Sequence, residues 1–238
     1  MKKILFILMA TTLFLMSCKK DSSNTLPPGA NTPIRVKTSV SPYESWTYSY
    51  NNAGRVIERL SGVSRITDEY SSGKVIQKVF TLGGMLTDTR TFTLDANGLI
   101  TQKTNTEDPA YLETILYNND RQMVKTIAQG SGYSEVDEYF YSNGNLDSSR
   151  ISHDGAWTVS FRYTYYTDKP NVMDHENFGE VYYGKGSKNL YKTYQSVYPD
   201  GTITEITNVS YEFDAQGRIV KRISQKGGNT GFINYTYE

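Results

Sequence analysis

Cysteine, histidine and tryptophan are scarce in this chain. Its 238 residues include one cysteine, two histidines and two tryptophans. A single cysteine excludes a disulfide within the chain, and two histidines without metal-ligand spacing give no reason to expect a metal centre. An excess of one charge is also missing, because 25 lysines and arginines balance 25 aspartates and glutamates. Without a basic stripe, no nucleic-acid partner is expected.

Long apolar runs are equally rare, and the longest lies at the N-terminus. Ile4 to Met16 is almost wholly apolar and follows two lysines. A transmembrane helix needs about 20 apolar residues, more than this run provides. A basic start, an apolar stretch and the small residue Ser17 instead predict a secretory signal peptide over residues 1–17.

The lone cysteine, Cys18, follows this signal directly. Leu15-Met16-Ser17-Cys18 resembles the bacterial lipobox, which implies that Cys18 becomes the lipid-bearing first residue of the mature protein. An ordinary cleaved signal usually ends in an A-x-A-like site, which is absent here. We therefore expect Cys18 to be a lipid anchor and the membrane to be a partner through that lipid.

The rest of the chain has the composition of β structure. Tyrosine occurs 20 times and glycine 19 times, and aromatic residues favour strands. No sustained helical spacing of apolar residues follows the signal. Residues 18–41 are rich in Ser, Asn, Thr and Pro, which predicts a disordered tether. Residues 42–238 are expected to form a single β domain.

One phrase recurs through this β domain. Its copies are aromatic-x-apolar, then Asn or Asp, two variable residues, Gly, one variable residue and Val or Ile. Three copies match position for position: YSYNNAGRV (48–56), FTLDANGLI (92–100) and YEFDAQGRI (211–219). Looser copies begin at Tyr70, Ile115 and Tyr139, and the copy at Ile115 lacks the glycine.

The phrase is typical of a β-hairpin. Asn or Asp bonds its own backbone to start a type I turn, and Gly takes the left-handed position. Turns at the opposite end are expected at Gly83-Gly84, Asp154-Gly155, Asp200-Gly201 and Gly227-Gly228. Strands joined in this way form an antiparallel up-and-down meander.

The strands after each repeat turn have no clean apolar face. Val56, Glu58 and Leu60 are expected to share one face by simple alternation, as are Val75 and Gln77. A large twisted sheet that curls toward a barrel or half-barrel tolerates this mixture better than a sandwich does. Charges such as Glu58, Lys125 and Lys221 would also break the apolar band of a membrane-spanning barrel.

The repeat resembles the YD repeats of Rhs-type proteins. The whole mature chain is also similar to a family of Bacteroidota lipoproteins of unknown function with a porin-like β fold. Segments typical of that family are YTDKPN (166–171) and YGKGSKNL (183–190). This resemblance implies a porin-like fold and an outer-membrane location, on the cell surface or the periplasmic face. It implies no cofactor and supplies no catalytic residue.

The longest stretch without the repeat, residues 166–190, holds the candidate ligand-binding residues. Tyr166, Tyr182 and Tyr183 could stack on a sugar if their rings are exposed, although tyrosines more often pack against a sheet. The acidic residues of this stretch, such as Asp174 and Glu180, are expected in a solvated loop rather than at a metal. No catalytic or metal-binding residue is predicted.

Two functions fit this sequence. The first is a non-enzymatic envelope lipoprotein that serves as a binding or scaffold module, with a glycan or an envelope protein as partner. The alternative is a surface protein that binds or hydrolyses glycans through residues 166–190. Hydrolysis would require two facing carboxylates beside a pocket.

Overall fold

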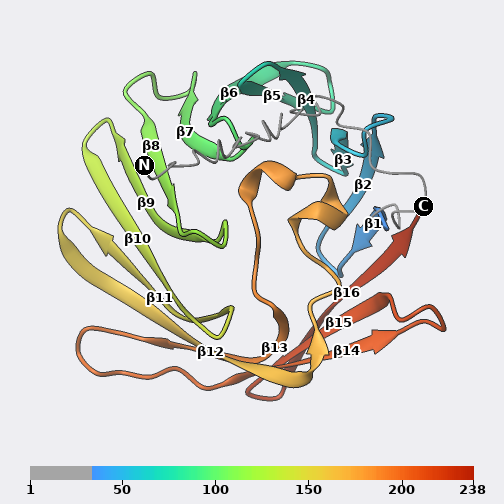
Figure 1. The fold of residues 1–238 in the computed structure, drawn as a ribbon, viewed down its shortest axis with the longest axis vertical. Coiled ribbons are helices and arrows are strands. Elements are labelled where there is room, and N and C mark those ends of the chain that lie inside the picture. The colour runs from blue at the N-terminus through green and yellow to red at the C-terminus, as the bar shows by residue number, and fades with distance from the viewer. Residues whose placement is uncertain (1–33) are drawn as a thin grey trace, which may run out of the picture. The chain divides into compact units, whose positions relative to one another are not determined.

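The repeated hairpins form a closed ring of strands (Figure 1). The computed structural model describes residues 34–238; the predicted signal, Cys18 and most of the predicted tether lie outside them. Each strand pairs antiparallel with its neighbours in sequence, and the first pairs with the last. The expected meander is therefore confirmed, and the sheet closes completely into a barrel of sixteen strands. Among the described residues, no helix has the length and apolar character needed to cross a membrane.

The elements follow one another with short connections, except between the twelfth and thirteenth strands. There, two short 3₁₀ helices intervene. In chain order the elements are β1 (Val36–Val40), β2 (Ser45–Tyr50), β3 (Val56–Ser61), β4 (Ser64–Ser71), β5 (Lys74–Thr81), β6 (Leu86–Leu94), β7 (Ile100–Asn105), β8 (Leu112–Tyr117), β9 (Met123–Gly130), β10 (Tyr133–Ser142), β11 (Asn145–His153), β12 (Ala156–Pro170), η1 (His175–Phe178), η2 (Val181–Tyr183), β13 (Asn189–Val197), β14 (Thr207–Phe213), β15 (Ile219–Lys226) and β16 (Asn229–Tyr237).

The repeat turns have the predicted chemistry. Asn51 Oδ1 accepts hydrogen bonds from the backbone N–H groups of Ala53 and Arg55, both at 3.0 Å. Gly54 has a φ of 71°, which glycine adopts without steric cost. In the copy that lacks glycine, Arg121 takes the same left-handed conformation with a φ of 65°.

A β-bulge follows most of these turns and overturns part of the predicted face assignment, whereas the turn before Val75 has no bulge and Val75 and Gln77 are both buried as expected. Tyr50 pairs with Val56, whereas Ser49 pairs with Glu58. The extra residue shifts the alternation, so Val56 is fully buried in the interior while Leu60 is 42% exposed on the outer wall. The expectation that Val56, Glu58 and Leu60 share one face is therefore wrong. Equivalent shifts occur where β7, β9 and β15 begin.

The β domain also begins earlier than residue 42, which was the predicted boundary. β1 starts at Val36 and pairs with β16, so it joins the two ends of the described chain and closes the barrel. Val36 is fully buried. This five-residue strand is hard to recognise in the sequence for two reasons. The residues around it are polar, and its partner strand is distant in the chain.

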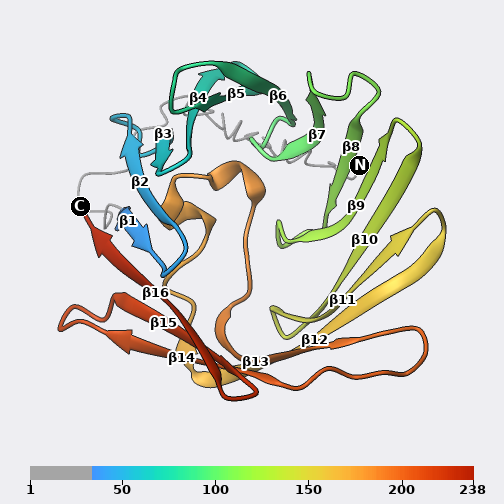
Figure 2. The same cartoon turned by 180° about the vertical axis from the view of Figure 1, so that it is seen from behind.

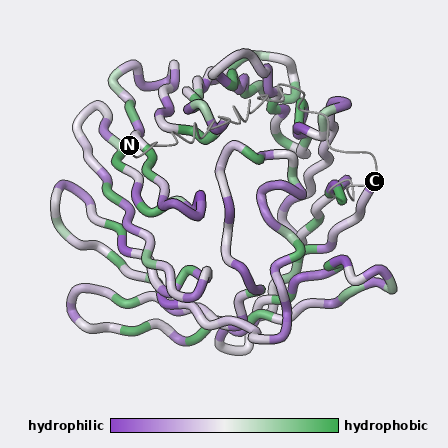
Figure 3. The backbone as a smooth tube through the Cα atoms, in the orientation of Figure 1, coloured by the Kyte–Doolittle hydropathy of each residue, from purple (hydrophilic) through white to green (hydrophobic). Residues whose placement is uncertain are grey.

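Hydrophilic and hydrophobic residues alternate along the strands around the whole ring (Figure 3). The outer wall carries ion pairs between neighbouring strands, with Lys125 and Arg150 both on Glu138, and Lys221 on Glu212. The interior holds both apolar residues and buried polar groups. The mixture of polar and apolar residues along the strands thus arises because the inner and outer faces of the barrel are each partly polar.

Residues 171–188, with η1 and η2, lie inside the ring; we call this segment the plug. Both views down the barrel show it there (Figures 1 and 2). It contacts one side of the interior through Tyr182 and Tyr183, and the other through Met173 and Phe178. The expected solvated loop is therefore wrong for this segment, because its aromatic residues pack against the inner wall.

Candidate functional site

The plug is hydrogen-bonded to the repeat turns, so it closes the end of the barrel that carries them. Its Gly179 carbonyl accepts from the Val56 N–H at 3.3 Å. Farther along, the Lys185 N–H donates to the Arg121 carbonyl and the Lys188 N–H donates to the Gly144 carbonyl, both at 2.9 Å. These bonds attach the plug to three separate hairpins.

Two glycines permit this close approach. A Cβ atom at Gly184 would lie 2.3 Å from the Arg121 carbonyl oxygen, and one at Gly179 would lie 2.5 Å from the Val56 nitrogen. Both residues also have positive φ angles, of 82° and 71°. Any side chain at these positions would therefore meet both a backbone clash and an unfavourable conformation.

Tyr182, a predicted ligand-binding residue, is part of the core. It is 2% exposed, and its ring stacks on Phe92 with the centroids 5.9 Å apart. Tyr183 packs beside it at 5.0 Å. These contacts favour a packing role for both tyrosines, of which Tyr182 is buried and Tyr183 half-buried.

A buried network of charged residues joins the plug to the barrel wall. Arg59 of β3 binds both Glu180 of the plug and Asp68 of β4, and Gln77 donates to Asp68 at 3.1 Å. Burial raises the pKa of both Asp68 and Glu180, even though the guanidinium acts to lower them. The two carboxylates are therefore bridged by Arg59 rather than facing each other across an open cleft.

The remaining acidic residues of the plug are not arranged around a metal. Asp174 caps η1 by accepting from the His175 N–H at 2.8 Å, and it also accepts from the Gly186 N–H at 2.8 Å. Within residues 34–238, no group of three His, Cys, Asp or Glu residues could hold a metal ion. Asp174 thus fixes the shape of the plug.

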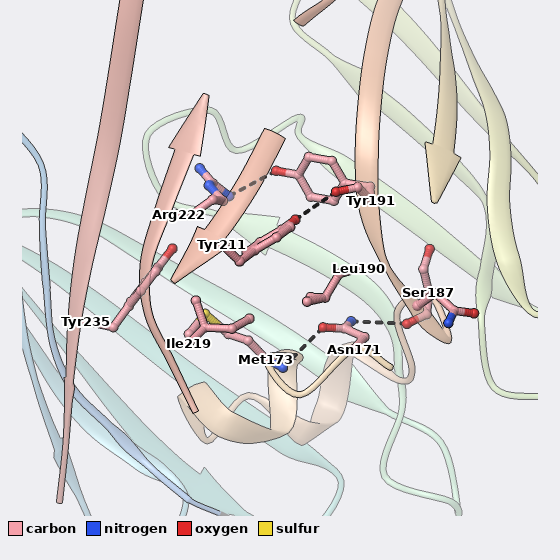
Figure 4. A pocket seen from close by; sticks show the side chains of 10 residues that line it. Asn171, Met173, Ser187, Leu190, Tyr191, Tyr211, Ile219, Arg222 and Tyr235 are labelled. Carbon is pink, nitrogen blue, oxygen red and sulfur yellow. Dashed lines mark hydrogen bonds between the residues drawn. The ribbon is translucent and has the colours of Figure 1, made fainter. Parts of the chain in front are cut away.

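A cavity of about 220 Å³ lies between the plug and the wall formed by β13 to β16 (Figure 4). We call it the lumen cavity. Its lining combines plug residues, tyrosines and one cation, and none of the lining residues is acidic. They are Asn171, Met173, Ser187, Asn189, Leu190, Tyr191, Tyr211, Ile219, Arg222 and Tyr235.

Arg222, on β15, is the only charged residue of this lining. Its Nη1 donates to the Tyr191 hydroxyl at 3.1 Å. Its Nε is buried and makes no hydrogen bond. No carboxylate within residues 34–238 pairs with Arg222, in contrast to Arg59. The lumen cavity therefore carries an unneutralised positive charge.

The tyrosines of the lining are neutral hydrogen-bonding groups. Burial raises the pKa of Tyr191 and of Tyr235, with Arg222 opposing the shift in both. The Tyr211 hydroxyl donates to the Tyr191 carbonyl at 3.0 Å. Within the described barrel, the Tyr235 hydroxyl makes no hydrogen bond, so it is free to donate to a ligand.

None of the three predicted tyrosines lines this cavity. Tyr166 lies near it, with its ring edge against Tyr211, but its hydroxyl donates to the Val209 carbonyl at 2.9 Å and Lys169 sits 4.2 Å from its ring centroid. The 166–190 segment instead contributes Asn171 and Ser187 among others.

Arg222 and the tyrosines of β13, β14 and β16 that line the cavity were not predicted from the sequence. Arg222 follows Lys221 directly, and the two look equivalent in sequence. The bulge after Ile219 sends Lys221 to the outer wall and Arg222 inward. Allowing for a bulge after the glycine of this repeat copy would have identified it.

No family model and no curated protein matches this chain. Among solved structures, it is similar to a porin-like protein from Bacteroides uniformis, with a TM-score of 0.62 and 19% identity, covering 86% of this chain and 96% of that one. It is also similar to a porin-like protein from Bacteroides vulgatus, with a TM-score of 0.61 and 11% identity, covering 86% of this chain and 99% of that one. The predicted porin-like fold is confirmed.

Proposed function

We propose that this protein is a non-enzymatic envelope lipoprotein, held to the outer membrane by lipid on Cys18, whose plugged barrel is a binding module. The observation that carries the proposal is the lumen cavity. It combines an unpaired cation with hydrogen-bonding tyrosines in a concave site, which is the usual form of a small-molecule site.

The plug argues against a role as an open channel. It is attached to three hairpins by backbone hydrogen bonds and to β3 and β4 through Arg59. Moving it out of the lumen would break these bonds and expose Tyr182 and its aromatic neighbours. A binding role uses the plug as it stands, because the plug forms one side of the cavity.

The outer wall favours a barrel that stands in water beside the membrane. A lysine or arginine facing lipid at mid-bilayer costs about 2–4 kcal/mol. The wall carries Lys125, Arg150 and Lys221, each paired with a glutamate on a neighbouring strand. Lipid on Cys18 would then provide the attachment that the wall does not.

The arrangement of carboxylates supports binding rather than glycan hydrolysis. Hydrolysis by two carboxylates needs an acid on each side of the scissile bond, and the lumen cavity is lined by none. The buried carboxylates of Asp68 and Glu180 are both engaged by Arg59. We therefore propose no hydrolase activity for the 166–190 segment.

Membrane fractionation of Cys18→Ser tests the proposal. The unaltered protein should stay in the membrane pellet after carbonate extraction, whereas the variant should move to the soluble fraction. Ser22→Ala, which leaves the lipobox intact, is the matched control and should remain in the pellet. A Cys18→Ser protein that resists carbonate in the outer-membrane fraction would contradict the proposal, because an uncleaved signal holds a protein in the inner membrane and only an embedded barrel would remain in the outer one.

A further inference from the structure

We propose that the lumen cavity binds a small organic carboxylate with a compact apolar body, and that Arg222 holds the carboxylate. This inference rests on the proposed binding function and names the ligand class.

The charge of the cavity calls for an anion. Arg222 is its only charged residue, and only Nη1 of its guanidinium makes a hydrogen bond within the described residues. The Nε donor, which is buried without a partner, and Nη2 therefore form an unused edge. Two parallel N–H donors on one edge match the two oxygens of a carboxylate.

The amide side chains in the cavity already make hydrogen bonds within the protein, so they are not available to bind a heavily hydroxylated ligand. The Asn171 amide donates to the Ser187 carbonyl and accepts from the Met173 N–H, both at 3.1 Å. The Asn189 amide donates to the Lys169 carbonyl and accepts from the Asn145 side chain. The Tyr191 and Tyr235 hydroxyls remain for the ligand, on the same side as Arg222.

The rest of the lining is apolar. Met173, Leu190 and Ile219 lie opposite Arg222 and the tyrosine hydroxyls (Figure 4). One water molecule takes up about 30 Å³ in the liquid, so a cavity of about 220 Å³ has room for a ligand the size of a single ring. A carboxylate at one end and a hydrocarbon body at the other would match both sides of this space.

Arg222 also lines a second depression, of about 200 Å³, and because the two spaces share this residue we take the depression as the entrance to the cavity. This depression lies beneath the β1–β2 turn, Ser41 to Tyr43, at the end of the barrel opposite the plug. Gly231 of β16 lines this depression and pairs with Ser224 on the neighbouring strand β15. A Cβ atom at Gly231 would have no neighbour within 4 Å, so a larger side chain there would narrow the path without a clash.

Isothermal titration of the purified full-length chain in detergent, with benzoate as the probe, tests the inference. Benzamide is the neutral ligand of the same shape. Benzoate should bind and benzamide should not. Arg222→Gln should weaken benzoate binding by roughly 10- to 100-fold, the usual range for a charge-assisted hydrogen bond. Arg162→Gln makes the same change at an exposed position of β12 and should leave binding unaltered.

Gly231→Leu provides an independent test that does not alter the cation. It should slow benzoate association in stopped-flow measurements while the unfolding temperature stays the same. Equal binding of benzoate and benzamide, or no loss of binding in a folded Arg222→Gln variant, would overturn the role of Arg222. Tighter binding of glucuronate or inorganic phosphate than of benzoate would overturn the apolar body. Either result leaves the anchoring test on Cys18 unaffected, so the two proposals fail separately.

Discussion

The two ends of the barrel are built differently. The end with the repeat turns has polar tips, and none of those turns in the described chain carries an exposed large apolar residue. The plug is hydrogen-bonded to it. At the opposite end, the turns present apolar side chains to solvent, and Tyr43 is 95%, Val63 73% and Met85 65% exposed. The plug end is therefore the end at which residues 171–188 bind hairpins distant from them in sequence.

This difference predicts where the barrel tolerates substitution. Contacts at the plug end join residues that are far apart in sequence, so a change there disturbs several hairpins together. A turn tip at the opposite end contacts at most the neighbouring hairpin, as Asp154 does through Ser134. Matched substitutions at the two ends should therefore separate clearly in their effects on stability.

The largest effect is expected from Tyr182→Ala. It removes a ring that is 2% exposed and in contact with Phe92, Tyr183 and Tyr70. Truncating a buried aromatic residue costs about 3–5 kcal/mol, and the free energy of unfolding from urea denaturation should fall by that amount. Tyr43→Ala, the same change at the opposite end, should alter it by less than about 0.5 kcal/mol. Similar losses for the two variants would show that the plug adds no stability.

A smaller difference is expected between two glycines of nearly equal φ. Gly184 has a φ of 82° and Gly84 a φ of 83°, but only at Gly184 would a Cβ atom meet the backbone, at 2.3 Å from the Arg121 carbonyl oxygen. Gly184→Ala should lower the free energy of unfolding by about 3 kcal/mol, through conformational strain and the clash. Gly84→Ala should cost about 1 kcal/mol through strain alone.

Urea denaturation of both glycine variants measures this pair. If they lose the same stability, the plug is not held against Arg121 as closely as the structure indicates. A second measurement, amide hydrogen exchange at Lys185, reports the contact itself. Exchange there should speed up in Gly184→Ala and stay slow in Gly84→Ala, because the Lys185 N–H donates to the Arg121 carbonyl.

The local parts of this fold could be predicted from sequence, whereas the contacts between distant segments could not. Asn51 and Gly54 specify their turn through neighbouring backbone atoms, so the hairpin can be inferred from nine residues. The closure of the barrel depends on Val36 meeting Tyr237, and no local pattern records that pairing.

The candidate site depended on the same long-range information. Tyr182 and Tyr235 are both buried tyrosines, but Tyr182 packs in the core whereas Tyr235 lines the cavity. Which of them contacts a ligand depends on where the plug folds. Arg222 faces inward only because a bulge shifts β15 by one residue, so simple alternation gives the wrong face for it.

The smallest predicted effect concerns the repeat turn without glycine. Arg121 is exposed and has a φ of 65°, which costs a residue with a side chain about 1–2 kcal/mol. Arg121→Gly relieves this strain but adds flexibility to the unfolded chain, which offsets about 0.5–1 kcal/mol of the gain. The free energy of unfolding should therefore rise by about 0.5–1 kcal/mol.

At the other end of the barrel, Asp154 is also left-handed, with a φ of 48°, but its carboxylate accepts from the Ser134 N–H at 2.9 Å. Asp154→Gly should bring no gain, because the lost hydrogen bond cancels the relief of strain. A gain in Asp154→Gly and none in Arg121→Gly, measured by urea denaturation, would show that the left-handed conformation of Arg121 is not strained and would contradict this prediction.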